Sequence, residues 1–158
     1  MRRTTAVDLF RPFVAVAAIA YVLLRAFYGS LPPVGYGIAA PLVFLAVIEF
    51  LAARRVRAAI SHHPEAKAMP AIMIARLVAL GKASALVSAG LMGALGALIL
   101  RVLPDVGRIH AATSDLRAGI VLLTVSAVLL TAGVVLERSG VDPGRPDDRR
   151  PGPPAAAA

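Results

Sequence analysis

Four apolar runs dominate the sequence, and each is long enough to cross a lipid bilayer as an α-helix. A crossing takes about 20 residues at a rise of about 1.5 Å per residue. The runs cover residues 10–28, 34–53, 83–100 and 118–136, and the last two contain no charged residue. Only 16% of the 158 residues are charged, whereas soluble domains have about 25%. The pattern predicts an all-α integral membrane protein with four transmembrane helices within residues 1–139.

The C-terminal residues 140–158 differ sharply from the rest of the chain. They are mostly Pro, Gly, Asp, Arg and Ala, and they end in four alanines. Such a segment has almost no apolar surface to bury, so we expect a disordered cytoplasmic tail.

Lysine and arginine between the apolar runs predict the orientation, because cytoplasmic loops of membrane proteins carry an excess of both. Thirteen of them fall on the side of the two termini and four on the opposite side. We therefore expect a multi-pass protein of the bacterial plasma membrane with both termini in the cytoplasm. The thirteen are Arg2, Arg3, Arg11, Arg54, Arg55, Arg57, Lys67, Arg76, Lys82, Arg138, Arg145, Arg149 and Arg150, and the four are Arg25, Arg101, Arg108 and Arg117.

The net charge of +8 does not indicate a nucleic-acid-binding protein, because no aromatic residues are interleaved with the basic ones to stack on bases. The cluster Arg54, Arg55 and Arg57 instead predicts contact with anionic lipid headgroups at a cytoplasmic loop.

Small residues recur at every fourth position around the third apolar run, at Gly81, Ala85, Ala89, Gly93 and Ala97. Transmembrane helices associate by close van der Waals packing, which small residues allow. Four residues turn a helix by about 400°, so each step drifts by about 40° and the row forms an inclined ridge. We expect this ridge to pack against another span of the same chain, and a homodimer interface is the alternative.

Glu49 is the one ionisable residue well inside an apolar run. A lone carboxylate in lipid is costly, so it should face protein or water and have a partner. Lys82 is the predicted partner, because it opens the third run at the same depth, and Arg76 is the second choice. A structural ion pair is the primary interpretation, and a proton or substrate relay is the alternative.

The three histidines give no convincing catalytic or metal site. His110 and Asp115 have the H-x4-D spacing of glycerolipid acyltransferases, in which His acts as a base, but a two-residue pattern is common by chance. His62 and His63, with Glu65 nearby, are too few ligands for a typical metal site. The chain has no cysteine, which excludes disulfides and thiol chemistry. We expect no enzyme activity, no metal and no cofactor.

Two prolines leave local structure open. Pro41 either kinks the second span or lies in its first turn. Residues 66–81 fit either an interfacial segment or the start of one long helix from about Pro70 to Leu103, ended by Pro104.

The chain resembles a family of small actinobacterial membrane proteins catalogued as domain of unknown function 3180. The likeness rests on "LPPVG" after the first run, "ARLVALGKASALVSAG" entering the third, Asp115 before the fourth, and "LER" at its end. Gly81 stands where alanine is common in that family. Gly140-Val141 stands where Cys-Arg often follows the Leu-Glu pair in that family. The resemblance implies four membrane helices and a loose gene-neighbourhood association with folate-pathway genes, but no activity.

The function that the sequence favours is that of a non-catalytic accessory or scaffold subunit, which binds a membrane protein partner or a second copy of itself. The alternative is a small oligomeric transporter or channel component that uses Glu49. Such a component needs a polar path, and the residues available for it are Glu49, Ser84, Ser88, Thr124, Ser126 and Thr131.

Overall fold

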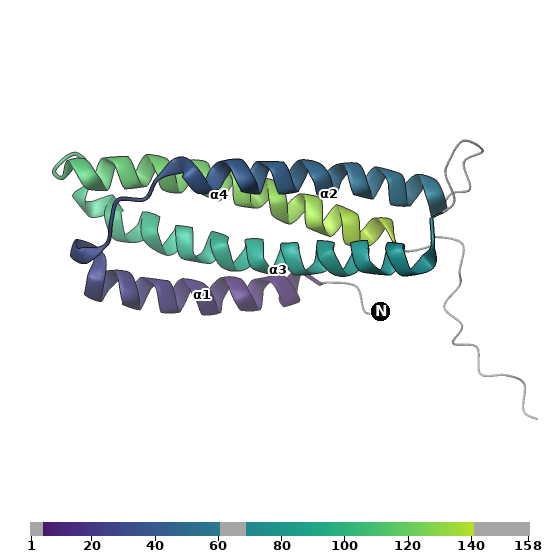
Figure 1. Cartoon of the computed structure of the whole chain (residues 1–158). Coiled ribbons are helices and arrows are strands. Elements are labelled where there is room, and N and C mark those ends of the chain that lie inside the picture. The colour runs from purple at the N-terminus through teal and green to yellow at the C-terminus, as the bar shows by residue number, and fades with distance from the viewer. Residues whose placement is uncertain (1–4, 61–68, 141–158) are drawn as a thin grey trace, which may run out of the picture.

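The computed structural model describes residues 5–60 and 69–140, and every regular element in these ranges is a helix (Figure 1). The long helices are α1 (Ala6–Phe27), α2 (Ala39–Ile60), α3 (Ala71–Val102) and α4 (His110–Ser139). All four are long and apolar enough to cross a membrane. The predicted all-helical fold with four membrane-length helices is therefore confirmed, while nearly all of the predicted tail lies outside the described residues.

Prolines mark where the helices begin and end. Pro70 directly precedes α3, so residues 71–82 belong to one long helix with the third apolar run. Pro104 lies in the short 3-10 turn η3 (Leu103–Asp105) that ends α3. Pro41 lies in the first turn of α2, where its missing N–H would have had no helical acceptor.

The helices form a row of pairwise contacts in the order α1, α3, α4, α2 (Figure 1). The helix α1 packs on α3, α3 packs on α4, and α4 packs on α2, whereas α2 and α3 touch only slightly. As an outer member of this row, α1 has no buried residue. The core consequently lies along α3 and α4, with one face of α2 added to it.

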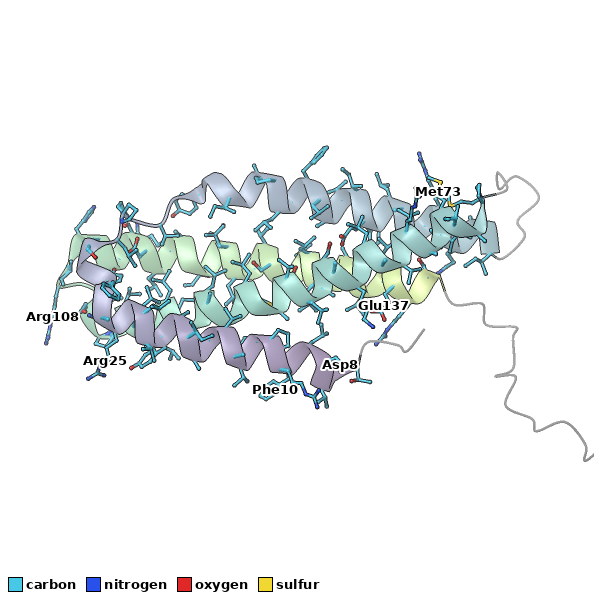
Figure 2. The ribbon with its side chains drawn as sticks, turned by 60° about the horizontal axis from the view of Figure 1, so that its bottom comes forward. Asp8, Phe10, Arg25, Met73, Arg108 and Glu137 are labelled. Carbon is cyan, nitrogen blue, oxygen red and sulfur yellow. The ribbon has the colours of Figure 1, made fainter. Side chains whose placement is uncertain are left out.

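The two ends of the molecule differ in their connections. One end, here called the turn end, carries η3 and the short turns η1 (Tyr28–Ser30) and η2 (Tyr36–Ile38). The opposite end, here called the terminal end, holds the start of α1 and the end of α4 (Figure 1). In Figure 2, Arg25 and Arg108 lie at the turn end, whereas Asp8 and Glu137 lie toward the terminal end.

A helix cap at the terminal end and a glycine turn at the turn end fix the local backbone. At the terminal end, the backbone N–H of Thr5 donates to Oδ2 of Asp8 over 2.9 Å, which caps the start of α1. At the turn end, Gly107 has a φ of 83°, a left-handed conformation that glycine adopts without a steric penalty. This turn reverses the chain between η3 and α4.

Candidate functional site

The helix α2 presents one narrow face to the rest of the protein, and Glu49 lies in the middle of it. The buried residues of α2 are Ala46, Glu49, Ala53 and Val56. Their spacing of three or four places them on one side of the helix. Ala46 and Ala53 pack against buried leucines of α4. Glu49, between them, therefore points into the protein.

The carboxyl group of Glu49 is fully buried, and neither of its oxygens has a hydrogen-bond partner among the described residues. The Ser84 hydroxyl of α3 lies near enough to interact with it electrostatically. Ser88, one turn further along the same face of α3, is also fully buried, and its Oγ has no hydrogen-bond partner. Helices α2 and α3 thus each contribute a buried side chain with unused hydrogen-bonding capacity, which is costly unless something else satisfies it.

The predicted ion pair between Glu49 and Lys82, or Arg76, is not formed in the structure. Lys82 and Ser84 are two residues apart in α3, so they project about 200° apart around the helix. Because Ser84 is turned toward Glu49, Lys82 is turned away, and it interacts electrostatically with Asp8 of α1. Arg76 is exposed, about 12 Å along α3 from the level of Ser84. The sequence predicts Glu49 and Lys82 at the same depth in the membrane, but Lys82 lies on a face of α3 that is turned away from Glu49.

All five residues of the small-residue ridge are buried, and the ridge packs within the chain. They are Gly81, Ala85, Ala89, Gly93 and Ala97. At the terminal end of the row, a Cβ added to Gly81 would lie 2.7 Å from the carbonyl oxygen of Gly133. A Cβ added to Gly133 would in turn lie 2.6 Å from the carbonyl oxygen of Gly81. The backbones of α3 and α4 therefore meet directly at this crossing.

Further along the ridge the contact passes from α4 to α1. A Cβ added to Gly93 would overlap the carbonyl oxygen of Phe13 and lie 3.1 Å from the amide nitrogen of Ala17. The drift of about 40° per step accounts for this change of partner, since twelve residues rotate the row by about 120° around the helix. One ridge thus serves two interfaces of the row.

A polar network at the turn end joins three parts of the chain. The Tyr28 hydroxyl donates to Oδ2 of Asp115 over 2.7 Å, and the backbone N–H of Val34 donates to Oδ1 over 2.9 Å. Arg101 lies over the Tyr28 ring at 5.1 Å and pairs with Asp105 at 3.0 Å. Sequence reasoning missed this network. The only signal for it was an aspartate placed at the edge of an apolar run.

The network also separates His110 from Asp115. Asp115 is buried and both of its oxygens accept structural hydrogen bonds, whereas His110 is exposed at the start of α4. His110 lines a surface hollow of about 430 Å³ together with Tyr36, Arg108 and Arg117, and Asp115 is not part of its lining. In this structure Asp115 cannot orient His110 as a base.

An apolar groove of about 530 Å³ runs between α2 and α4 on the outer face of the row. The hydroxyls of Thr124 and Thr131, which line it, donate to the backbone carbonyls of Ile120 and Ala127 in their own helix. Their methyl groups remain to line the groove. The lining residues are Val43, Ala46, Val47, Phe50, Leu51, Thr124, Ala127, Val128, Thr131 and Ala132.

No cluster of three or more His, Asp or Glu side chains that could hold a metal ion occurs in the described ranges. His62, His63 and Glu65 lie outside those ranges, so the expectation that they form no metal site stays a prediction.

No curated protein and no solved structure matches the chain. A family described as protein of unknown function (DUF3180) matches residues 10–143, which include all four membrane-length helices except the first turn of α1. The predicted resemblance is therefore confirmed, and the chain belongs to this DUF3180 family.

Proposed function

We propose that the protein is a multi-pass plasma-membrane protein with both termini in the cytoplasm, and that it acts as a non-catalytic accessory subunit. Its partner is a membrane protein, and one transmembrane helix of that partner binds in the groove between α2 and α4. The observation that carries the proposal is the groove itself, which is open, apolar and lies midway along two membrane-length helices.

The shape and chemistry of the groove suit a helix. Its lining extends over eight residue steps in α2 and eight in α4, or about 12 Å of each helix. Ala46, Ala127 and Ala132 contribute small side chains, and larger ones such as Phe50 and Val128 flank them. Helices in membranes associate where small residues let their backbones approach.

A positive charge lies at one end of the groove. Phe50 lines the groove, and the Arg54 guanidinium lies 4.9 Å above its ring. Arg54 and Arg55 are both exposed. A partner helix with an acidic residue at its cytoplasmic end would complement this charge, and anionic lipid headgroups would compete for it.

Three hydroxyl groups of α4 that a polar path would use are bonded within their own helix, which favours binding over transport. Ser126 donates to the carbonyl oxygen of Leu122 over 2.7 Å, as Thr124 and Thr131 do to their own helix. A hydroxyl bonded in this way has no proton left to donate to water or an ion in a polar path. The engaged carboxylate of Asp115 likewise argues against an enzyme built around His110.

Site-specific crosslinking in native membranes tests the proposal. The chain has no cysteine, so a single substitution gives one attachment point for a photo-crosslinker. Val128→Cys places it in the groove, and Val87→Cys places it on the exposed side of α3 outside the groove lining. We expect Val128→Cys to crosslink to one other membrane protein and Val87→Cys to yield only lipid adducts. Crosslinks from Val128→Cys to lipid alone, or to a second copy of this chain, would contradict the proposal.

A further inference from the structure

Ser84 and Ser88 lie one turn apart on α3, and Ser84 interacts with the buried carboxyl of Glu49 on α2. Glu49 and Ser88 are both fully buried, and Glu49 Oε1, Glu49 Oε2 and Ser88 Oγ all lack a hydrogen-bond partner among the described residues. Ser84 is 7% exposed and interacts with the Glu49 carboxyl. An uncompensated carboxylate in such surroundings is strongly unfavourable, so a positive charge has to accompany it.

No residue in the described ranges donates a hydrogen bond to the Glu49 carboxyl. Lys82 of α3 and Glu137 of α4 lie toward the terminal end, and each has interactions of its own. Neither forms a hydrogen bond or ion pair with Glu49. On α2, Arg54 is exposed and lies over Phe50, and α1 does not contact α2. Within residues 5–60 and 69–140 the Glu49 carboxyl therefore has no bonded cationic side chain.

We propose that Glu49, Ser84 and Ser88 form a binding site for one monovalent cation, a proton or Na+. A single carboxylate matches a single positive charge, so a divalent ion would leave excess charge in a buried site. Carboxylate and hydroxyl oxygens are hard ligands, which suit a proton or an alkali cation and not a soft metal ion. The site does not depend on the proposed accessory function.

Binding at this site would join two helices that otherwise touch only slightly. Glu49 belongs to α2, which packs mainly on α4, whereas both serines belong to α3. A cation held between them adds a link between α2 and α3. Cation binding should therefore stabilise the position of α2 in the row.

Thermal unfolding of the full chain in an uncharged detergent tests the proposal. The unfolding midpoint is measured at acidic and alkaline pH while NaCl replaces choline chloride at constant ionic strength. If the cation is a proton, acid raises the wild-type midpoint at every Na+ concentration, because protons then bind the folded state better than the unfolded state. If it is Na+, the midpoint at alkaline pH rises with Na+ concentration and saturates.

Matched variants assign the response to the site. Glu49→Gln is neutral and nearly isosteric, and it should lose the response to both cations. Glu137→Gln, which changes the other buried glutamate of the core, should keep the wild-type response. For a Na+ site, Ser88→Ala removes one oxygen ligand and should raise the Na+ concentration at half effect by about tenfold, or about 1.4 kcal/mol. Equal responses of wild type and Glu49→Gln to both pH and Na+ would overturn the proposal.

A spectroscopic readout decides the question even if Glu49→Gln does not fold. In the Glu137→Gln background, a protonated buried Glu49 gives an infrared carboxyl band, and Na+ or alkaline pH should abolish it. A carboxylate spectrum at every pH that does not change with Na+ would also overturn the proposal.

Discussion

The Tyr28 hydroxyl, at the end of α1, donates a hydrogen bond of 2.7 Å to the buried carboxylate of Asp115 in α4. These residues are 87 positions apart in the sequence, and α1 and α4 do not otherwise pack along their lengths. The second oxygen of the same carboxylate accepts the Val34 N–H from the α1–α2 connection. The Asp115 side chain thus links three segments of the chain at the turn end of the molecule.

Replacing Asp115 by leucine should therefore destabilise the fold strongly. The substitution leaves the Tyr28 hydroxyl and the Val34 N–H without their acceptor, and each lost charge-assisted bond costs about 1.5–3 kcal/mol. We expect a loss of about 3–5 kcal/mol in the free energy of unfolding, measured in detergent. Tyr28→Phe removes one of the two bonds and should cost about half as much.

The control for this prediction is His110→Ala, which changes an exposed side chain five residues earlier in α4. It should alter the free energy of unfolding by less than about 0.5 kcal/mol. If Asp115→Leu were as well tolerated as His110→Ala, the network would not be what holds the turn end.

A second pair of substitutions tests the contact between α1 and α3. Gly93→Ala places a methyl group where the Phe13 carbonyl oxygen lies, so the two helices have to separate. Because α1 packs only on α3, it has no second neighbour that would keep it in place. We expect Gly93→Ala to lower the midpoint of thermal unfolding and to weaken disulfide crosslinking between cysteines introduced into α1 and α3.

Gly96→Ala, three residues along the same helix, is the matched control. A Cβ at this position meets no atom within 4 Å. Alanine also favours a helix over glycine by about 1 kcal/mol, so this variant should be as stable as the wild type or more stable. Equal effects of the two substitutions would show that backbone approach at Gly93 does not hold α1.

The sequence predicts the four helices and the packing ridge better than the partners of individual polar groups. Length and hydropathy are sufficient for the helices, because a bilayer crossing needs about 20 apolar residues wherever it occurs. The regular spacing from Gly81 to Ala97 indicates a close interface, because backbone approach requires small side chains in a row. These features depend on local pattern alone.

Partners across helices depend on rotation, which hydropathy does not specify. Lys82 lies at the depth expected for a partner of Glu49, but a difference of two residues from Ser84 turns it toward α1. The H-x4-D spacing pairs Asp115 with His110, whereas the donors to its carboxylate are the Tyr28 hydroxyl and the Val34 N–H. The row order of the helices brings these groups together, and the sequence gives no direct signal of that order.

Labelling from outside intact cells tests the orientation that the basic residues predict. Arg108 is exposed at the turn end (Figure 2). Arg55 is exposed in the last two turns of α2, which ends at the opposite end of the row (Figure 1). With no native cysteine, Arg108→Cys and Arg55→Cys each give one reactive thiol. A membrane-impermeant maleimide should label Arg108→Cys in intact cells and Arg55→Cys only after permeabilisation. The reverse pattern would place both termini outside the cytoplasm.

The apolar groove between α2 and α4 can be filled without disturbing the core. Ala127→Phe adds a ring to the groove wall at a partly exposed position of α4. Because this side chain projects into open space between α2 and α4, the midpoint of thermal unfolding should change little. A crosslinker at Val43→Cys, on the opposite wall, should then lose its protein adduct in native membranes.

Ala83→Phe, which adds the same ring at an exposed position of α3 outside the groove lining, should leave the adduct intact. If both phenylalanines weaken the adduct equally, the partner does not bind in the groove; if only Ala127→Phe does, its helix occupies the space between α2 and α4.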